Sequence, residues 1–531
     1  MQIMLVNIKR FWDSFYVSFI QSGSFYRFSL DKRSGVFSDE KFIMDPWPGD
    51  ILNGKNILNG KITTEFSTVP FEIEEFLTYK QICLDFRDCA KYANSFFWMR
   101  DLQAIGGNSG RKRARKFISI FIENYRKEKR FWQKDPQWNL AVLGERLCSW
   151  IFSYSFVVSG ASDEFRKNFL SSLCEQYSHL LKSYRIENNP YSKIVILKGL
   201  IFCQFVMKNV NLRILRKLIR ELKDAIEQSF DQYGMVVSRN PLEQFDLFRS
   251  LIEIRFISKN LDLGLLNDFL SNKLSKMASC VRLLRFGDGG LAQFSGDFKS
   301  LESFMILTRQ LIDTTVSVVD IKTNGTNIAT GFDRLATKKS IVIVNTAVSN
   351  LKSKFNRFNE PGINIFDFEA SFGMDRVIYR SDISMLFDGF RIKANKNSRS
   401  FSKKEIKGDG IFFEGEIENN TNNLSFAIRR ELFVNANKLQ ISGTDFVSMR
   451  EKFVSFIRFV LNEKCNINKV NDKLVLISIG QKQYKLNIIM GQNIKSIIIK
   501  DDFTYPSIEI EIENCNFDNI QIKWDIEQME I

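Results

Sequence analysis

The sequence predicts an all-α domain followed by an antiparallel β-sandwich. Between about residues 76 and 286, apolar residues recur with the period of a helix, as in the stripe of leucine and isoleucine over residues 212–226. After about residue 305 the period changes to two, and Ser507–Glu513 alternates strictly between isoleucine and polar residues. Many short strands at regular spacing are typical of a sandwich, so the second half is predicted to be all-β.

The predicted helices follow one another with short turns. Their apolar patterns cover residues 113–126, 138–157, 164–184, 192–208, 212–226, 242–256 and 265–285. Pro241 lies where a helix accepts a first-turn proline. Residues 1–20 also have apolar residues at helical spacing. They predict an amphipathic helix packed on the body of the protein, with a membrane-surface helix as the alternative.

The predicted strands are of two kinds. Asn519–Trp524 alternates in the same way as Ser507–Glu513, which predicts half-buried strands. Three other segments are apolar throughout and predict more fully buried strands: Ile341–Val344, Leu474–Ile477 and Ile497–Ile499. Turns are predicted at Asn324-Gly325, Asp409-Gly410 and Asn435-Ala436-Asn437. We expect a lead-in segment over residues 1–75, a helical domain over 76–300 and a sandwich over 301–531.

The composition is that of a folded, basic protein. The 531 residues include 75 Lys and Arg against 61 Asp and Glu, a net charge of +14. This excess favours an anionic partner: nucleic acid, an acidic polysaccharide or an anionic membrane surface. The densest basic run, Arg111–Lys116, is expected to be a solvated helix face. Aromatic residues do not interleave with it, so it gives little support to a groove for single-stranded nucleic acid.

Histidine and cysteine usage narrows the chemistry and the compartment. A single histidine excludes a zinc site built on several imidazoles, and any Ser-His-Asp triad would need His179. This residue lies inside a predicted helix, and we expect it on the surface or in a groove. The 8 cysteines form no CxxC pair, so we expect buried, reduced thiols, with one or two disulfides as the alternative. No apolar run approaches the length of a membrane helix and no signal peptide is clear, which favours the cytoplasm over export by an unrecognised route.

Several segments, in this order along the chain, resemble the bacterial heparinase II/III-like family, and in particular its alphaproteobacterial branch. They span roughly residues 45–450 and are Asp45–Asp50, Trp98–Gly107, Trp138-Asn139, Gly144–Trp150, Ser238–Pro241, Arg285–Gly296, Gly331–Leu335, Arg429–Leu432 and Leu439–Asp445. The resemblance implies an incomplete α/α toroid followed by an antiparallel β-sandwich. It also implies a polysaccharide lyase that acts by β-elimination on acidic, uronate-containing polysaccharide.

The chain departs from this family at its histidines. Where relatives resemble Gly-Gly-His, this sequence has Gly234-Met235-Val236, and Phe286 and Ile428 stand where relatives carry histidine. The family's histidine-serine-threonine motif has no counterpart, and the segment nearest to it is Leu386–Gly389. Without these side chains a metal site and histidine-based acid–base catalysis both lose their support. We therefore expect no metal and no cofactor.

Tyr233, Arg239 and Asn240 are the candidate catalytic residues. A tyrosine has an ordinary pKa near 10, so Tyr233 needs a cationic neighbour to act as a base. Arg239 is a candidate partner for a uronate carboxylate, with a helix C-terminus as its alternative partner. Asn240 precedes Pro241 and has helix capping as its alternative role. A turn tyrosine that covers the next helix is the alternative for Tyr233.

Four further residues are assigned to substrate binding: Arg146, Trp150, Asp288 and Arg334. Arg146 and Trp150 are four residues apart on one helical face, and the resemblance implies a sugar groove lined by arginine and aromatic side chains. Core packing is the alternative for Trp150, and a turn between domains is the alternative for the Asp288 loop. Two other functions stay open: an inactive relative that binds acidic glycan or supports surface-polysaccharide metabolism, and a nucleic-acid-binding protein.

Overall fold

The computed structural model describes residues 29–63, 68–70, 87–127, 136–260, 264–292, 294, 331–346, 363–387, 390–391, 399–421, 424–449, 453–491, 494–501, 505–514 and 520–529. The chain forms two compact units. The helical unit contains Met1–Asp231, Asp246–Leu274 and Lys299–Val316, and the sandwich unit contains Gln232–Phe245, Ser275–Phe298 and Ser317–Ile531. The predicted helix over residues 1–20, the turn at Asn324-Gly325 and the domain boundaries near residues 75 and 300 lie outside the described residues.

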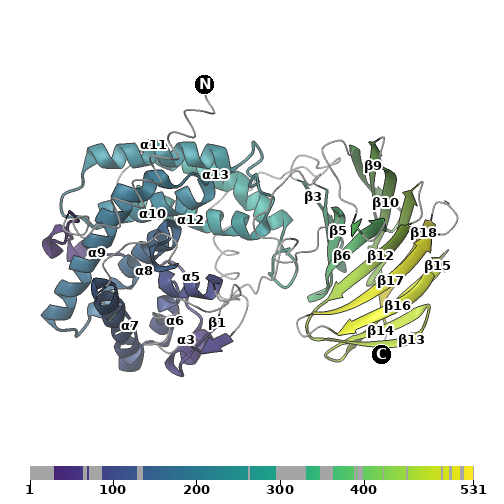
Figure 1. Cartoon of the computed structure of the whole chain (residues 1–531), viewed down its shortest axis with the longest axis horizontal. Coiled ribbons are helices and arrows are strands. Elements are labelled where there is room, and N and C mark those ends of the chain that lie inside the picture. Colours follow the sequence, from purple (N-terminus) through teal and green to yellow (C-terminus); the bar gives the residue numbers. More distant parts are fainter. Residues whose placement is uncertain are drawn as a thin grey trace. The chain divides into compact units, whose positions relative to one another are not determined.

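Helices make up almost all of the regular structure before residue 284, as the 3.6-residue period predicted (Figure 1). Those in the described residues are α3 (Ile51–Leu58), α5 (Arg87–Ser95), α6 (Met99–Ile105), α7 (Gly107–Lys127), α8 (Leu140–Val158), α9 (Asp163–Ser183), α10 (Pro190–Val206), α11 (Leu212–Ser229), α12 (Pro241–Asn260) and α13 (Gly264–Leu283). A two-stranded ribbon, β1 (Lys61–Thr63) with β2 (Thr68–Pro70), lies between α3 and α5.

Capping side chains explain where several helices begin. Asp50, Asn139, Ser162, Asn189 and Asn211 each accept hydrogen bonds from backbone N–H groups in the first turn of the following helix. These N–H groups have no partner within the helix itself, so a polar side chain at this position stabilises the helix by about 1 kcal/mol. The short polar residues between the apolar stripes therefore set the helix starts locally.

Two glycines bring α8 and α10 into backbone contact. A Cβ atom on Gly199 would lie 2.6 Å from the carbonyl oxygen of Gly144, and one on Gly144 would lie 2.8 Å from that of Val195. Larger residues would push the two helices apart. Among the described helices, α8 alone is long and apolar enough to cross a membrane, but 78% of its most apolar window is buried inside the protein. Its packing on α10 is that of a core helix.

The β half is a sandwich of two antiparallel sheets (Figure 1). One sheet has the strand order β13-β14-β15-β18-β11-β10-β9-β8, and the other has the order β16-β17-β12-β6-β5-β4-β3, with β7 paired to β6. The strands are β3 (Phe332–Ala336), β4 (Ser340–Asn345), β5 (Ile363–Phe372), β6 (Asp375–Phe387), β7 (Phe390–Arg391), β8 (Arg399–Lys407), β9 (Gly410–Thr421), β10 (Leu424–Asn435), β11 (Gln440–Met449), β12 (Phe453–Leu461), β13 (Cys465–Asn471), β14 (Leu474–Ile479), β15 (Lys482–Gly491), β16 (Ile494–Asp501), β17 (Pro506–Asn514) and β18 (Ile520–Gln528).

The period-two prediction is confirmed in the strands that alternate. In β17, Ile508, Ile510 and Ile512 are fully buried and the glutamates between them point to the other face. The predicted turns at Asp409-Gly410 and Asn435–Asn437 connect β8 to β9 and β10 to β11. Five cysteines are free and buried, as predicted: Cys148, Cys174, Cys203, Cys280 and Cys465.

The prediction of more fully buried strands is wrong for two of the three apolar runs. Leu474–Ile477 alternates between half-buried and buried residues, and in Ile497–Ile499 only the first isoleucine is buried. These runs form β14, which is second from one end of its sheet, and β16, which is the edge of the other. A strand of a sandwich sheet has one face on the core and the other on the outside, and an apolar composition alone does not reveal which residues lie on the outer face.

Candidate functional site

The loop of residues 232–240, which joins α11 to α12, is fastened by side chains from α12 and α13. Gln244, which is fully buried on α12, accepts a hydrogen bond from the Val236 N–H at 2.7 Å and donates one to the Gly234 carbonyl at 3.1 Å. Lys276 on α13 donates to the Gln232 carbonyl at 2.9 Å. The loop therefore presents its side chains from a backbone with little freedom.

Gly234 is required by the geometry of this loop. Its φ is +85°, a conformation that only glycine adopts at little cost. A Cβ atom here would also lie 2.6 Å from the Cβ of Lys276 and 2.8 Å from its carbonyl carbon. Any larger residue at this position would displace the loop from α13.

Two of the three candidate catalytic residues project from this loop toward solvent. Tyr233 is 40% exposed and Arg239 is partly exposed. Arg239 has a φ of +56°, which is uncommon outside glycine and costs of order 1–3 kcal/mol. Backbone strain of this kind persists only where the surroundings enforce it, and it is found often at binding and catalytic sites. The fastened loop supplies that enforcement.

Asn240 has the capping role that the sequence left open. Its Oδ1 accepts hydrogen bonds from the Leu242 N–H at 2.9 Å and the Glu243 N–H at 3.4 Å, so it caps α12. The side chain is 5% exposed. Asn240 thus holds the end of the loop that carries Arg239.

Arg334 of β3 contacts α13 about one helix turn from Cys280, the α13 residue that contacts Tyr233. The Cys280 thiol contacts the Tyr233 carbonyl at 3.5 Å, and Nη1 of Arg334 donates to the Leu283 carbonyl at 3.3 Å and to that of Arg285. Residues 280 and 283 are separated by only about 4.5 Å of helix rise. Burial, and then the nearby Arg285, lower the pKa of Arg334 to about 10. Its guanidinium satisfies carbonyls at the C-terminus of α13, a position that favours cations.

The Asp288 turn follows directly after α13. Asp288 is exposed, and its Oδ1 accepts a hydrogen bond from the Gly290 N–H at 2.7 Å. Arg376 supports the turn from β6, with its guanidinium 4.5 Å from the Phe286 ring centroid and Nη1 donating to the Leu291 carbonyl at 2.7 Å. Phe286, where the resembled family has a histidine, is 3% exposed beneath this arginine. The turn can offer the Asp288 carboxylate to a ligand, but its aromatic residue cannot transfer a proton.

Arg146 and Trp150 lie in the interior of the helical unit. The guanidinium of Arg146 donates to Gln176 Oε1 at 2.6 Å, to the Asn94 carbonyl at 2.8 Å and to the Gln137 carbonyl at 2.9 Å. Burial lowers its pKa to about 9. Trp150 is fully buried and stacks on Phe169 at 4.7 Å. In this structure both residues pack the core and expose no surface on which a sugar could stack.

The expectation of a surface or groove position for His179 is wrong. The side chain is fully buried in α9, with its ring edge-on to Trp138 at a centroid distance of 5.6 Å. Burial, followed by the charges of Arg146 and Lys182, lowers the pKa of His179 to about 3. The imidazole is therefore neutral at ordinary pH and is shielded from any substrate. The side of α9 on which the aromatic core packs could not be identified from the helical period alone.

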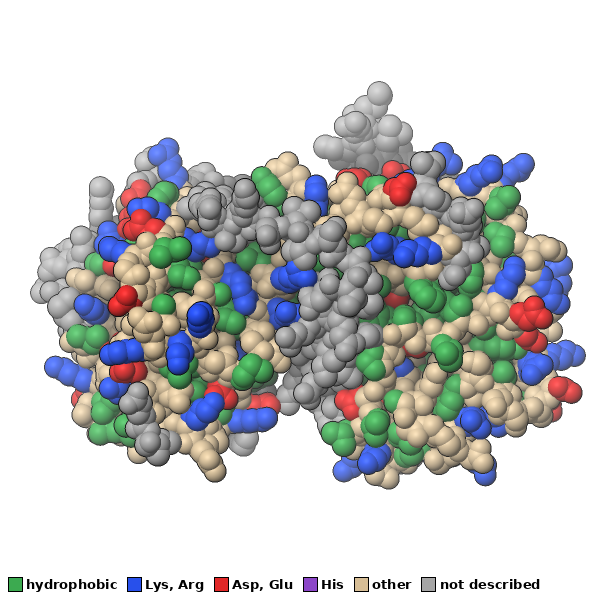
Figure 2. All heavy atoms as spheres, turned by 180° about the vertical axis from the view of Figure 1, so that it is seen from behind, with side chains coloured by type: hydrophobic (Ala, Val, Ile, Leu, Met, Phe, Trp, Pro, Cys, Tyr) green, Lys and Arg blue, Asp and Glu red, His purple; other side chains and the backbone are tan. Residues whose placement is uncertain are grey.

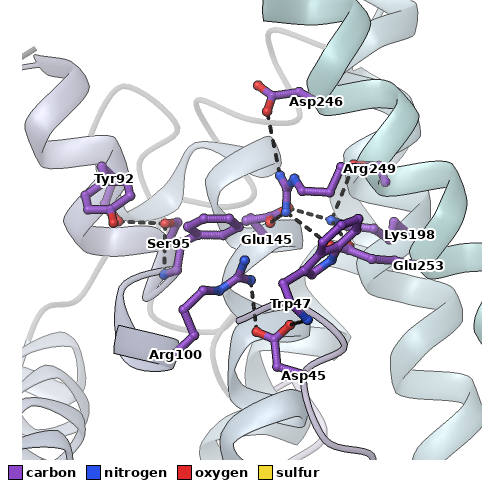
Figure 3. Close-up of polar contacts among 12 residues, drawn as sticks. Asp45, Trp47, Tyr92, Ser95, Arg100, Glu145, Lys198, Asp246, Arg249 and Glu253 are labelled. Carbon is purple, nitrogen blue, oxygen red and sulfur yellow. Dashed lines mark hydrogen bonds and ion pairs between the residues drawn. The ribbon is translucent and has the colours of Figure 1, made fainter. Parts of the chain in front are cut away.

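A buried charge network joins three helices of the helical unit (Figure 3). Nζ of Lys198 on α10 contacts Glu145 of α8 and Glu253 of α12, each at 2.7 Å. Arg249 reaches the same two carboxylates at 2.8 and 3.2 Å and lies 4.0 Å from Asp246. Two cations thus face three carboxylates, so the network has no spare positive charge for an acidic sugar.

The lead-in segment is attached to this network. Trp47 Nε1 donates to Glu253 at 2.7 Å, and Asp45 pairs with Arg100 at 3.0 Å (Figure 3). A Cβ atom on Gly49 would lie 2.1 Å from the Arg100 carbonyl oxygen. The Asp45–Asp50 segment that contributes to the family resemblance therefore has a structural role in joining the start of the chain to α6 and α12.

One charged cluster in the sandwich was missed by the sequence reasoning. On the face of its sheet opposite the sandwich core, Arg380 pairs with Asp367 at 3.2 Å and with Asp382 at 3.0 Å, and Arg458 pairs with Asp382 at 2.9 Å. Burial raises the pKa of Asp367 to about 7. Although burial also acts on Asp382, Arg380 and Arg458 hold its pKa below the usual value. The sequence signal that could have predicted this cluster is the presence of charged residues at the outward-facing positions of neighbouring strands.

No metal-binding group of three or more His, Cys, Asp or Glu side chains occurs among the described residues. The candidate site therefore consists of Tyr233 and Arg239 on a fastened loop, Asp288 on an exposed turn, and the supporting side chains around them. Its chemistry rests on phenol, guanidinium and carboxylate groups.

The chain has the architecture of an incomplete α/α toroid followed by an antiparallel sandwich, which is the fold of solved heparinase III and heparan sulfate lyase structures. Among solved structures, a heparinase III matches over 94% of this chain and 86% of its own, with a TM-score of 0.62 and 12% identity. The heparan sulfate lyase of Pedobacter heparinus matches over 93% and 86%, with a TM-score of 0.53 and 12% identity. No family model and no curated protein sequence matches the chain. These likenesses show the fold.

Proposed function

We propose that this protein is a polysaccharide lyase that cleaves acidic, uronate-containing polysaccharide by β-elimination. The observation that carries the proposal is the likeness to a heparinase III over nearly the whole length of both chains. The exposed Tyr233 and the strained Arg239 on one fastened loop, and the net charge of +14, support it. A cytoplasmic location, on biosynthetic or imported oligosaccharide, belongs to the same proposal.

In the proposed reaction Arg239 binds the uronate carboxylate. Its guanidinium neutralises the charge there and makes the proton on the adjacent carbon more acidic. The Tyr233 phenolate removes this proton, a carbon–carbon double bond forms, and the bond from the neighbouring carbon to the glycosidic oxygen breaks. The departing oxygen takes a proton from the Tyr233 hydroxyl, which regenerates the phenolate. Asn240 and Gln244 act as positioning residues because they hold the loop.

A second candidate function is that of an inactive relative that binds acidic glycan. The observation in its favour is the burial of His179, which leaves the chain without an accessible imidazole for acid–base catalysis. Under this alternative, Arg239 and the basic surface keep their affinity for uronate polymers while no bond is broken. Nucleic-acid binding has weaker support, because part of the basic run on α7 has partners within the protein.

The test incubates purified protein with a panel of uronate polymers and follows unsaturated uronate ends by ultraviolet absorbance and bound polymer by sedimentation. We expect product, and we expect Tyr233→Phe to reduce its rate by at least about 100-fold, the usual effect of removing an acid–base group. Tyr191→Phe is the matched control, since it removes a phenol whose hydroxyl bonds to Asp246 in the helical unit.

Three outcomes separate the candidates. Product that depends on Tyr233 supports the lyase. Salt-sensitive binding without product supports the inactive relative and overturns the lyase. Absence of both product and binding across the panel overturns both proposals for uronate polymers.

A further inference from the structure

The first half of α11 carries a basic surface that has no partner in the described part of the chain. Its four cations are Arg213, Arg216, Lys217 and Arg220, and residues 212–220 contain no acid. The three arginines are exposed and Lys217 is partly exposed. We call these four residues the α11 basic face.

The helical geometry places these cations in one strip. Positions 213, 216, 217 and 220 lie three or four residues apart, so they share one face of the helix. From Arg213 to Arg220 the strip extends about 10 Å along the axis. The opposite face packs into the helical unit through Leu215, Leu218 and Leu222, which are 0–2% exposed. Figure 1 shows α11 along an outer edge of this unit.

The other basic run of the chain, on α7, has partners within the protein for part of its cations. Nε of Arg115 donates to the Val157 carbonyl at 2.7 Å, and its other nitrogens donate to the carbonyls of Ser159 and Gly160. Arg111 donates to Asn108, and Arg113 lies over the Phe117 ring at 5.1 Å. The expectation of a solvated face holds for Lys112 and Lys116, which are exposed, whereas Arg115 is bonded to carbonyls at the end of α8. None of the four residues of the α11 basic face makes such a contact within the described residues, whereas Lys223, further along the helix, lies over the Phe269 ring at 5.3 Å.

The charge order along α11 opposes the helix dipole. The positive end of a helix dipole is at its N-terminus, where acids are favourable and cations unfavourable by about 0.3–1 kcal/mol each. In α11 four of the five cations occupy the N-terminal half, and Glu221, Asp224 and Glu227 lie in the second half together with Lys223. Glu221 is held by Lys193 at 3.6 Å and by the Tyr184 hydroxyl at 2.9 Å, so it does not neutralise the strip. Helix stability does not account for this arrangement, whereas an anionic ligand does.

We propose that the α11 basic face is an accessory binding strip for an extended acidic polysaccharide chain. The choice of polysaccharide rests on the function proposed above, and the strip itself rests on charge complementarity. Its length suits a polymer with repeated negative charges better than a single small anion. The large apolar residue exposed on α11 is Leu212, and no aromatic ring lies in residues 212–220 for a base to stack on. This favours a glycan over a single-stranded nucleic acid.

The test compares two quadruple variants of the full-length protein. The strip variant carries Arg213→Gln, Arg216→Gln, Lys217→Gln and Arg220→Gln, because glutamine has a helix propensity close to those of arginine and lysine. The control carries Lys112→Gln, Lys167→Gln, Lys438→Gln and Lys464→Gln at other exposed lysines. Both lower the net charge from +14 by 4, to +10. Lys and Arg are spread over both units on the face drawn in Figure 2, so a control of equal charge is essential.

Affinity is measured by calorimetry for a long heparin chain, a heparin tetrasaccharide and a DNA duplex, over a range of salt concentrations. For the strip variant we expect affinity for the long chain to fall about tenfold, equivalent to about 1.4 kcal/mol, with a shallower salt dependence. The strip variant should bind the tetrasaccharide with the same affinity as the unaltered protein. The affinity of the control variant for the long chain should change by less than about threefold.

Equal losses in the strip and control variants would overturn the accessory strip and leave the lyase proposal intact. A larger loss for DNA than for heparin would replace the polysaccharide with nucleic acid as the occupant. Failure of the unaltered protein to bind any uronate polymer would overturn the proposed function instead. Circular dichroism of both variants checks that α11 is retained.

Discussion

The only histidine of the chain provides a direct test of the buried core of the helical unit. His179 is fully buried and burial lowers its pKa to about 3, whereas a histidine in the unfolded chain has a pKa of about 6.5. As the pH falls below 6.5 the unfolded chain gains a proton that the folded protein does not accept. The stability that neutral His179 provides is therefore fully present above pH 6.5 and declines as the pH falls toward 3.

The magnitude follows from the distance to the unfolded pKa. pH 5 is about 1.5 units below the unfolded pKa, and each unit stabilises the protonated unfolded chain by about 1.4 kcal/mol. The free energy of unfolding at pH 5 is therefore lower by about 2 kcal/mol than at pH 8. Urea unfolding of the unaltered protein and of His179→Gln, followed by circular dichroism at several pH values, isolates this contribution. The difference between the two proteins should change by about 2 kcal/mol over this range, because all other groups are common to both.

NMR makes the same test in the folded state. Since the chain contains one histidine, its imidazole signals need no assignment. We expect them to stay unshifted from pH 8 to pH 5. Signals that titrate near pH 6.5 in the folded protein, or identical pH dependence in His179→Gln, would refute the buried neutral imidazole. Such signals would also restore histidine as a candidate for acid–base catalysis.

Four further variants test the other parts of the structure. Asp101 is 1% exposed and burial raises its pKa to about 7, above the unfolded value of about 3.9, so stability is lost as the pH rises from about 4 to 7. Between pH 5 and 8 this contribution falls by about 3 kcal/mol, so urea unfolding of Asp101→Asn should show a pH dependence that is weaker by about this amount. Lys198→Met leaves the carboxylate of Glu253 short of a buried partner and should lower the free energy of unfolding by about 3–5 kcal/mol, while a loss below about 1 kcal/mol would contradict the network. Gln244→Ala removes both hydrogen bonds that fasten the Tyr233 loop, and the loss of these buried bonds should lower the free energy of unfolding by about 1–3 kcal/mol. Product formation, or glycan affinity, should also fall under conditions where circular dichroism shows that the variant is still folded. Arg213→Glu should raise the free energy of unfolding by about 0.3–1 kcal/mol while it weakens polymer binding, and a loss of stability would count against the dipole argument.

Local patterns in the sequence predicted the course of the chain well. The helical period before residue 286 and the period of two in β17 and β18 describe where side chains point along a single element. These directions depend on the geometry of the helix and strand themselves, so they can be predicted without knowledge of the neighbours. The caps at Asn139 and Asn211 are equally local, because the side chain bonds to the backbone two or three residues away.

The candidate site was predictable in part. The sequence singled out Tyr233, Arg239 and Asp288, and the structure places all three at least partly exposed on short loops. It also singled out Arg146 and Trp150, which the structure buries. A helical pattern states that two residues share a face, but the element that covers this face is determined by contacts far away in the chain. For Arg146 those contacts come from Asn94, Gln137 and Gln176.

Periodicity and composition were enough to predict helices first and an antiparallel sandwich second, in a basic chain with a single histidine. The tertiary structure decided which charges are free. Arg115 and Arg213 stand in similar basic helical runs, yet only Arg115 reaches the carbonyls at the end of another helix. The partners of Lys198 likewise come from α8 and α12, 53 and 55 residues away. Burial and ion pairing depend on such distant segments, whereas periodicity reports only on the segment that contains it.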